Sequence, residues 1–164
     1  MAGEGVATQV DTWVASMGRY DAEFANDGNY DTVSVTYSEG TEAWWKLTFP
    51  STIVVDKILI YPRSCCKFML HQVTGSDRIR CLLLCSCYQS DCLLINFHFS
   101  VYVGDELAGT VTYVEDQTMY SFSDLNLKGS VITLWNSATI FPGARSSDKR
   151  IELNEVEVYA GNGK

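Results

Sequence analysis

Short segments in which apolar and polar residues alternate dominate this chain. Alternation with a period of two is typical of antiparallel strands that bury one face, because successive side chains point to opposite faces of a sheet. The clearest example is Glu-Val-Glu-Val-Tyr at 155–159. The same pattern predicts strands at 44–49, 53–61, 97–103, 110–114 and 131–135, with turns at 26–28, 104–105, 128–129 and 142–143.

These strands and polar turns predict an all-β antiparallel sandwich or barrel. Outside a weak stretch at 69–85, apolar residues do not recur with helical spacing over three turns, and no internal repeat is present. The 164 residues and 46% hydrophobic content favour a single domain, residues 1–164, with a sizeable core.

The segment at about 71–96 interrupts the alternation and is interpreted as an atypical insertion. It contains four of the six cysteines, namely Cys81, Cys85, Cys87 and Cys92. It could be an extra hairpin, a translated stretch that other transcripts splice out, or a metal-binding excursion. The cysteine spacing, taken with His98, matches no familiar structural zinc site.

The net charge of the chain argues against some classes of function. Twelve Lys and Arg against 20 Asp and Glu leave a net charge of −8, which argues against binding to nucleic acid or to an anionic membrane face. The apolar runs are far shorter than the roughly 20 residues that cross a bilayer. No nucleophile motif, catalytic carboxylate pair or phosphate-binding glycine loop is recognisable, so a non-enzymatic role is expected.

The compartment follows from the N-terminus and the cysteines. The first residues lack the basic and apolar regions of a secretory signal, so we expect a cytosolic protein or one whose signal is removed or missing. An even number of cysteines suits an oxidising compartment, although all six fall within positions 65–92 and staple no distant loops. An extracellular, secreted location is the expectation.

Five short motifs together resemble the F-type lectins (fucolectins), a jelly-roll β-sandwich family related to discoidin and galactose-binding-like domains. They are Ala7-Thr8-Gln9, Asn26-Asp27-Gly28-Asn29, Trp44-Trp45-Lys46-Leu47, Arg63-Ser64-Cys65-Cys66 and Asn154-Glu155-Val156-Glu157-Val158-Tyr159. The resemblance spans residues 6–160 apart from the insertion. It implies a calcium-dependent lectin that binds fucose-type sugars on glycans, such as those of microbes, as a homo-oligomer that gains strength through multivalency.

The motif at 26–29 and the last motif carry the calcium prediction. Asp27, Asn29, Ser34 and Glu155 are hard oxygen donors, and Ca²⁺ takes six to eight oxygen ligands. The resemblance implies side-chain ligands from Asp27, Asn29 and Glu155. It further implies oxygens, some from the backbone, from Phe24, Ser34 and Asn154. The alternative is an Asx-turn at 26–28 and a solvated edge strand at 155–157.

The resemblance also implies a sugar site built from a His, two Arg and a disulfide between adjacent cysteines. Arg63 occupies the first Arg position and Cys65-Cys66 the cysteine pair, while Tyr37 stands where the His is expected. The Asp that usually follows the Arg is absent, which leaves Arg63 less firmly oriented. The alternatives are a surface charge at Arg63 and two unpaired thiols.

The second Arg falls where the insertion begins. Lys67 is nearest, but its ammonium is not a planar fork, and Arg78 fits the motif only with a longer loop. Two other functions therefore remain open: a lectin-like domain that has lost sugar binding and serves in protein interaction or adhesion, and an accessory domain of a glycan-active hydrolase.

Overall fold

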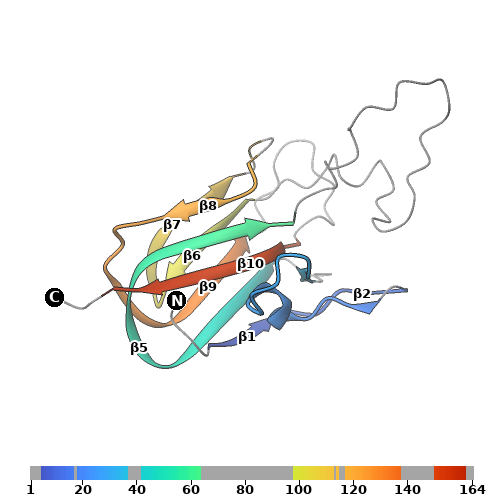
Figure 1. Cartoon of the computed structure of the whole chain (residues 1–164), viewed down its shortest axis with the longest axis horizontal. Coiled ribbons are helices and arrows are strands. Elements are labelled where there is room, and N and C mark those ends of the chain that lie inside the picture. Colours follow the sequence, from blue (N-terminus) through green and yellow to red (C-terminus); the bar gives the residue numbers. More distant parts are fainter. Residues whose placement is uncertain are drawn as a thin grey trace.

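The computed structural model describes residues 5–16, 18–36, 42–63, 98–112, 114, 117–137 and 150–161 (Figure 1). Within them the regular structure is antiparallel β apart from one 3₁₀ turn, as the alternation predicts. The elements are β1 (Val6–Gln9), β2 (Val14–Ala15), β3 (Gly18–Arg19), η1 (Ala22–Ala25), β4 (Ser34–Val35), β5 (Glu42–Pro62), β6 (His98–Val103), β7 (Glu106–Thr112), β8 (Tyr120–Phe122), β9 (Leu127–Ser137) and β10 (Glu152–Ala160).

One long bent strand, β5, connects the two layers of the sandwich. Its first part pairs with β1, its second part pairs with β10 and β8, and β9 pairs with both parts across a register shift between Thr48 and Ile53. Figure 1 shows the strand curving from the side of β1 to the side of β10. The first layer continues through β9 to β6 and β7, and the second through β10 to β4.

The structure confirms the turn predicted at 104–105 and contradicts the one predicted at 128–129. Gly104 adopts a positive φ of 58° at the turn between β6 and β7, as predicted at 104–105. The turn predicted at 128–129 is wrong, because both residues lie inside β9. Gly129 is needed there for close packing, since a Cβ would stand 2.7 Å from the backbone nitrogen of Gly104. The strands predicted at 44–49 and 53–61 are one strand, and 142–143 lies outside the described residues.

The apolar faces of both layers form one core. Trp45 is fully buried at its centre, and its indole N–H donates a 3.0 Å hydrogen bond to the carbonyl oxygen of Ala22. This bond satisfies the polar atom of a large buried side chain and ties η1 to β5. The other large, fully buried side chains include Leu47, Ile58, Ile60, Phe99, Ile132, Leu134, Ile151 and Leu153.

Strand β10 is buried along both faces. It lies between β4 and β5, and its residues from Glu152 to Val158 are all buried. Leu153, Val156 and Val158 belong to the core, whereas the polar side chains point the other way and are covered by the segment between η1 and β4. The solvated edge strand considered for 155–157 is therefore wrong.

Candidate functional site

The segment 26–32, here called the oxygen loop, lies over the polar face of β10. The Gly28 N–H donates a 3.1 Å hydrogen bond to Oε2 of Glu155. The side-chain amide of Asn154 donates to the carbonyl oxygens of Tyr30, at 3.0 Å, and Thr32, at 2.9 Å. Gly28 has a φ of 75°, a left-handed conformation that favours glycine. Contacts from two neighbouring residues of β10 therefore hold the oxygen loop in place.

A β-bulge lets Asn154 and Glu155 act together. The register shifts between Leu153, which pairs with Pro62, and Glu155, which pairs with Tyr61. The extra residue disturbs the alternation, so that two consecutive side chains reach the same loop while Leu153 and Val156 stay in the core. Without the bulge, one of the two polar side chains would point into apolar surroundings.

Four oxygen atoms converge on the hydroxyl of Thr32. They are the backbone oxygen of Phe24 at 3.1 Å, Oδ1 and Oδ2 of Asp27 at 3.1 and 3.0 Å, and the backbone oxygen of Asn29 at 2.7 Å. A hydroxyl has one proton to donate, so it can satisfy only one of these acceptors at a time. Two of these acceptors have a second donor, because the Thr32 N–H bonds the backbone oxygen of Asn29 at 3.2 Å and the Asn29 N–H bonds Oδ1 of Asp27 at 2.8 Å. The segment from Phe24 to Thr32 thus gathers oxygen atoms of the kind that Ca²⁺ takes as ligands.

The side chain of Asn29, which was predicted to bind calcium, accepts a backbone hydrogen bond in the structure. Oδ1 of Asn29 accepts the N–H of Asp31 at 3.1 Å, and the N–H of Asn29 donates to Oδ1 of Asp27 at 2.8 Å. The Asx-turn considered as the alternative at 26–28 thus forms one residue later, from Asp27, and a second Asx-turn starts at Asn29. Thr32 was not among the site residues predicted from the sequence, although its hydroxyl group stands only five positions after Asp27.

Among the carboxylates of this region, those of Asp27 and Glu155 repel each other. Burial raises the pKa of Glu155 to about 7; the Gly28 N–H acts against this rise, and the negative charge of Asp27 adds to it. Glu155 is only 3% exposed. Among the described residues, neither Asp27 nor Glu155 forms an ion pair. A bound cation would relieve this electrostatic penalty.

The remaining predicted ligands occupy different positions. The Ser34 hydroxyl donates to Oε1 of Gln9 at 2.7 Å, and Gln9 in turn donates to the backbone of Tyr20 and Val35. Ser34 is thereby part of a buried polar link between β1 and β4. The structure thus brings Phe24, Asp27, Asn29 and Glu155 to the oxygen loop, with Asn154 holding that loop through its amide.

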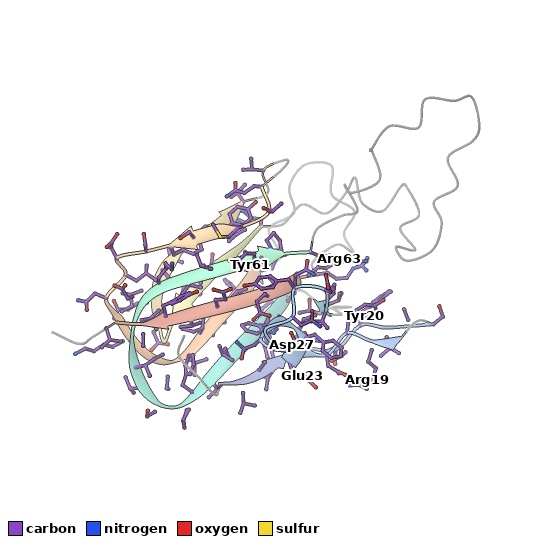
Figure 2. The ribbon with its side chains drawn as sticks, in the orientation of Figure 1. Arg19, Tyr20, Glu23, Asp27, Tyr61 and Arg63 are labelled. Atoms are coloured by element: carbon purple, nitrogen blue, oxygen red, sulfur yellow. The ribbon has the colours of Figure 1, made fainter. Side chains whose placement is uncertain are left out.

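Arg63 lies at the end of β5 and is held by a buried carboxylate (Figure 2). Its Nη1 lies 2.9 Å from Oε2 of Glu152, and its backbone N–H donates to the Glu152 carbonyl oxygen at 3.1 Å. The side chain of Arg63 is 32% exposed, against 6% for Glu152. The missing Asp led us to expect a loosely oriented Arg63, and Glu152 supplies that carboxylate from another strand.

The two regions are neighbours along β10, because Glu152 and Glu155 are three residues apart, or about 10 Å along a strand. Figure 2 shows Asp27 in the loop that follows η1. The other predicted sugar-site residues, Tyr37, Cys65, Cys66, Lys67 and Arg78, lie outside the described residues, as does the insertion at 71–96.

Among the described residues, no group of three or more His, Cys, Asp or Glu side chains is placed to hold a metal ion. No helix in this part of the chain is long and apolar enough to cross a membrane.

The chain was compared with known proteins. No family model matches it, and no curated protein matches it in sequence. Among solved structures, a fucolectin from serum of the striped bass Morone saxatilis is 20% identical, with a TM-score of 0.62, over 95% of this chain and 46% of that one. A Streptococcus pneumoniae fucose-binding module, SpX-3, is 21% identical, with a TM-score of 0.58, over 96% and 95% of the two chains.

A third similar structure belongs to an enzyme. The family 89 glycoside hydrolase of Clostridium perfringens is 12% identical, with a TM-score of 0.61, but the match covers only 14% of its chain against 98% of this one. These likenesses show the fold: the chain has the antiparallel β-sandwich of F-type lectins and fucose-binding modules. It spans less than half of the striped bass lectin.

Proposed function

We propose that this chain is a carbohydrate-binding domain that recognises fucose-type sugars on glycans without catalysis. The observation that carries this proposal is the Arg63–Glu152 pair at the end of β5, in a fold shared with fucose-binding proteins. The domain would act outside the cell, and a homo-oligomer would raise its avidity through several weak sites.

The chemistry of the pair suits a sugar. Sugar hydroxyls need several donors fixed in direction, and a guanidinium offers five N–H groups in a rigid plane. Glu152 is buried, so its contact with Nη1 sets the direction of that plane rather than competing for it from solvent. Tyr37, Cys65, Cys66, Lys67 and Arg78 are proposed to complete the site.

We further propose that the oxygen loop holds Ca²⁺. The ligands would be the carboxylates of Asp27 and Glu155 and the backbone oxygens of Phe24 and Asn29. Ser34 and Asn154 stay proposed contributors from the resemblance. The convergence of oxygens on Thr32 and the uncompensated carboxylates support this set. When bound, the ion would neutralise both carboxylates, and the loop would be held against β10 beside Arg63.

A fucose-affinity column run in calcium tests the sugar proposal. The wild type should be retained and eluted by free fucose, whereas Arg63→Ala should pass through. Arg19→Ala is the matched control, because Arg19 also pairs with a carboxylate, that of Asp21, but its side chain is 64% exposed and lies on β3. Retention of Arg19→Ala is expected.

Three outcomes would count against the proposal. A wild-type protein that is not retained in calcium, on fucose or on a glycan array, would refute sugar binding. Equal retention of Arg63→Ala would remove Arg63 from the site. A protein partner that binds the wild type and Arg63→Ala equally well would favour the interaction module instead.

A further inference from the structure

Glu157 is a third carboxylate on the polar face of β10, beside Glu152 and Glu155, and it is satisfied in a different way from Glu155. The hydroxyl of Tyr30 donates a hydrogen bond to Oε1, and the hydroxyl of Tyr159 donates to Oε2. Glu157 is 9% exposed, and the Lys57 ammonium lies 4.5 Å from the centre of the Tyr159 ring. Both carboxylate oxygens therefore have their own donors, without a metal ion.

The two phenols come from different parts of the fold. Tyr159 is on β10 itself, two residues from Glu157, so its hydrogen bond is local. Tyr30 belongs to the oxygen loop and stands 127 positions away in the chain. Of the two phenol bonds to Glu157, only that of Tyr30 therefore joins the oxygen loop to β10, in addition to the bonds of Gly28 and Asn154.

Three contacts hold Tyr30 against the sandwich. Its carbonyl oxygen accepts the amide of Asn154, its hydroxyl donates to Glu157, and its ring stands edge-on to the ring of Tyr61 at 4.9 Å between centres. The three partners lie on β10 and β5. Because Tyr30 directly follows Asn29 and lies three residues after Asp27, fastening it restricts the two loop residues that supply cation ligands.

We propose that Tyr30 and Glu157 form a clamp that positions the oxygen loop for its cation, with Glu157 occupied by phenols so that Glu155 serves as the strand's ligand. This inference rests on the proposed calcium site. Tyr30 is a positioning residue: its hydroxyl acts through Glu157 and the loop backbone, and not on the ion. Outer-shell contacts of this kind hold ligands in the geometry that a metal needs, and losing one costs about 10- to 100-fold in affinity.

Paired phenylalanine variants test the clamp. Tyr30→Phe keeps the ring and its contact with Tyr61 but removes the hydroxyl bond that crosses to Glu157. Tyr159→Phe, the matched control, removes the bond to the other oxygen of the same carboxylate without touching the loop. In calcium titration calorimetry, Tyr30→Phe should bind about 10-fold more weakly than wild type, and Tyr159→Phe should stay within about threefold.

A second measurement needs no metal. In EDTA, backbone amide hydrogen exchange at residues 28–32 should accelerate in Tyr30→Phe and stay near the wild-type rate in Tyr159→Phe, because only the first loses one of the bonds that tie the loop to the strand. Unchanged exchange in Tyr30→Phe, or equal acceleration in both variants, would overturn the clamp.

The two readouts separate the clamp from the calcium proposal. Calcium binding that is equally tight in wild type and Tyr30→Phe would overturn the clamp while leaving the cation site in place. A wild type that binds no calcium would overturn the cation site, and with it the role of the clamp toward the ion. Faster exchange in Tyr30→Phe would then establish Tyr30 as a purely structural tie.

Discussion

Replacing Glu155 by Gln tests the electrostatics of the oxygen loop most directly. Gln has nearly the same shape, and its side-chain oxygen can still accept the hydrogen bond from the Gly28 N–H. The substitution removes only the charge that burial and Asp27 disfavour. Without calcium, the variant should therefore be more stable than wild type above pH 7.

The size of this effect follows from the pKa of Glu155, which rises from 4.5 to about 7 on folding. Each pH unit between the two values corresponds to about 1.4 kcal/mol, so burying the charge costs at most about 3 kcal/mol. Between pH 4.5 and 7 the folded protein holds a proton that the unfolded chain has lost. This contribution to stability is complete below pH 4.5, is lost as the pH rises through 7, and then stays constant.

Thermal unfolding from pH 4 to 8.5, in EDTA and in calcium, measures the effect. At about 3 °C per kcal/mol, Glu155→Gln should melt up to about 9 °C above wild type at pH 8 in EDTA, with no difference below pH 4.5. Calcium should raise the melting temperature of wild type and leave that of Glu155→Gln nearly unchanged. Glu23→Gln, which removes an exposed charge on η1, is the control and should behave as wild type.

Two results would refute this reasoning. If wild type and Glu155→Gln show the same pH dependence in EDTA, the buried charge does not cost what the structure indicates. If calcium stabilises both proteins equally, Glu155 is not a ligand, and the proposed cation site is wrong in its central residue.

Three further substitutions test the fold. Trp45→Phe should cost about 2 to 4 kcal/mol in urea unfolding, because it leaves a cavity and removes the donor to the Ala22 carbonyl; a loss below 1 kcal/mol would contradict this. Gly28→Ala should lower the free energy of unfolding by only about 1 to 2 kcal/mol, because a Cβ there meets no atom within 4 Å and only the positive φ disfavours it. Gly109→Ala should cost about 1 to 3 kcal/mol, because its Cβ would lie 2.3 Å from the Phe122 ring; adding Phe122→Leu should recover part of this loss, and no recovery would exclude that clash.

The alternation predicted the strands well because it reflects a local property, the exposure of alternate side chains on a pleated sheet. It failed where non-local packing overrides local signals. Pro50 and Ser51 suggest an interruption between two strands, yet β5 runs through them as it bends between the layers. Lys128 and Gly129 have turn composition, yet they lie in β9 because they pair with Val54 and Ile53 of β5.

The candidate site divides in the same way. Asp27, Asn29 and Arg63 were recognisable because short motifs carry them, and an Asx-turn forms from neighbouring residues. The partners of these residues were not recognisable. Glu152 lies 89 positions from Arg63, and Glu157 lies 127 positions from Tyr30. No local pattern relates such pairs, because only strand register brings them together.

The sequence by itself therefore determined the all-β architecture and the oxygen-rich loop, since both follow from the order of neighbouring residues. Only the tertiary structure decided what the polar face of β10 does. A bulge turns Asn154 and Glu155 toward the same loop, two phenols satisfy Glu157, and Glu152 pairs with Arg63. The physical reason is burial, because a buried carboxylate needs donors or a cation to offset its charge, and the Gly28 N–H offsets the charge of Glu155 only in part.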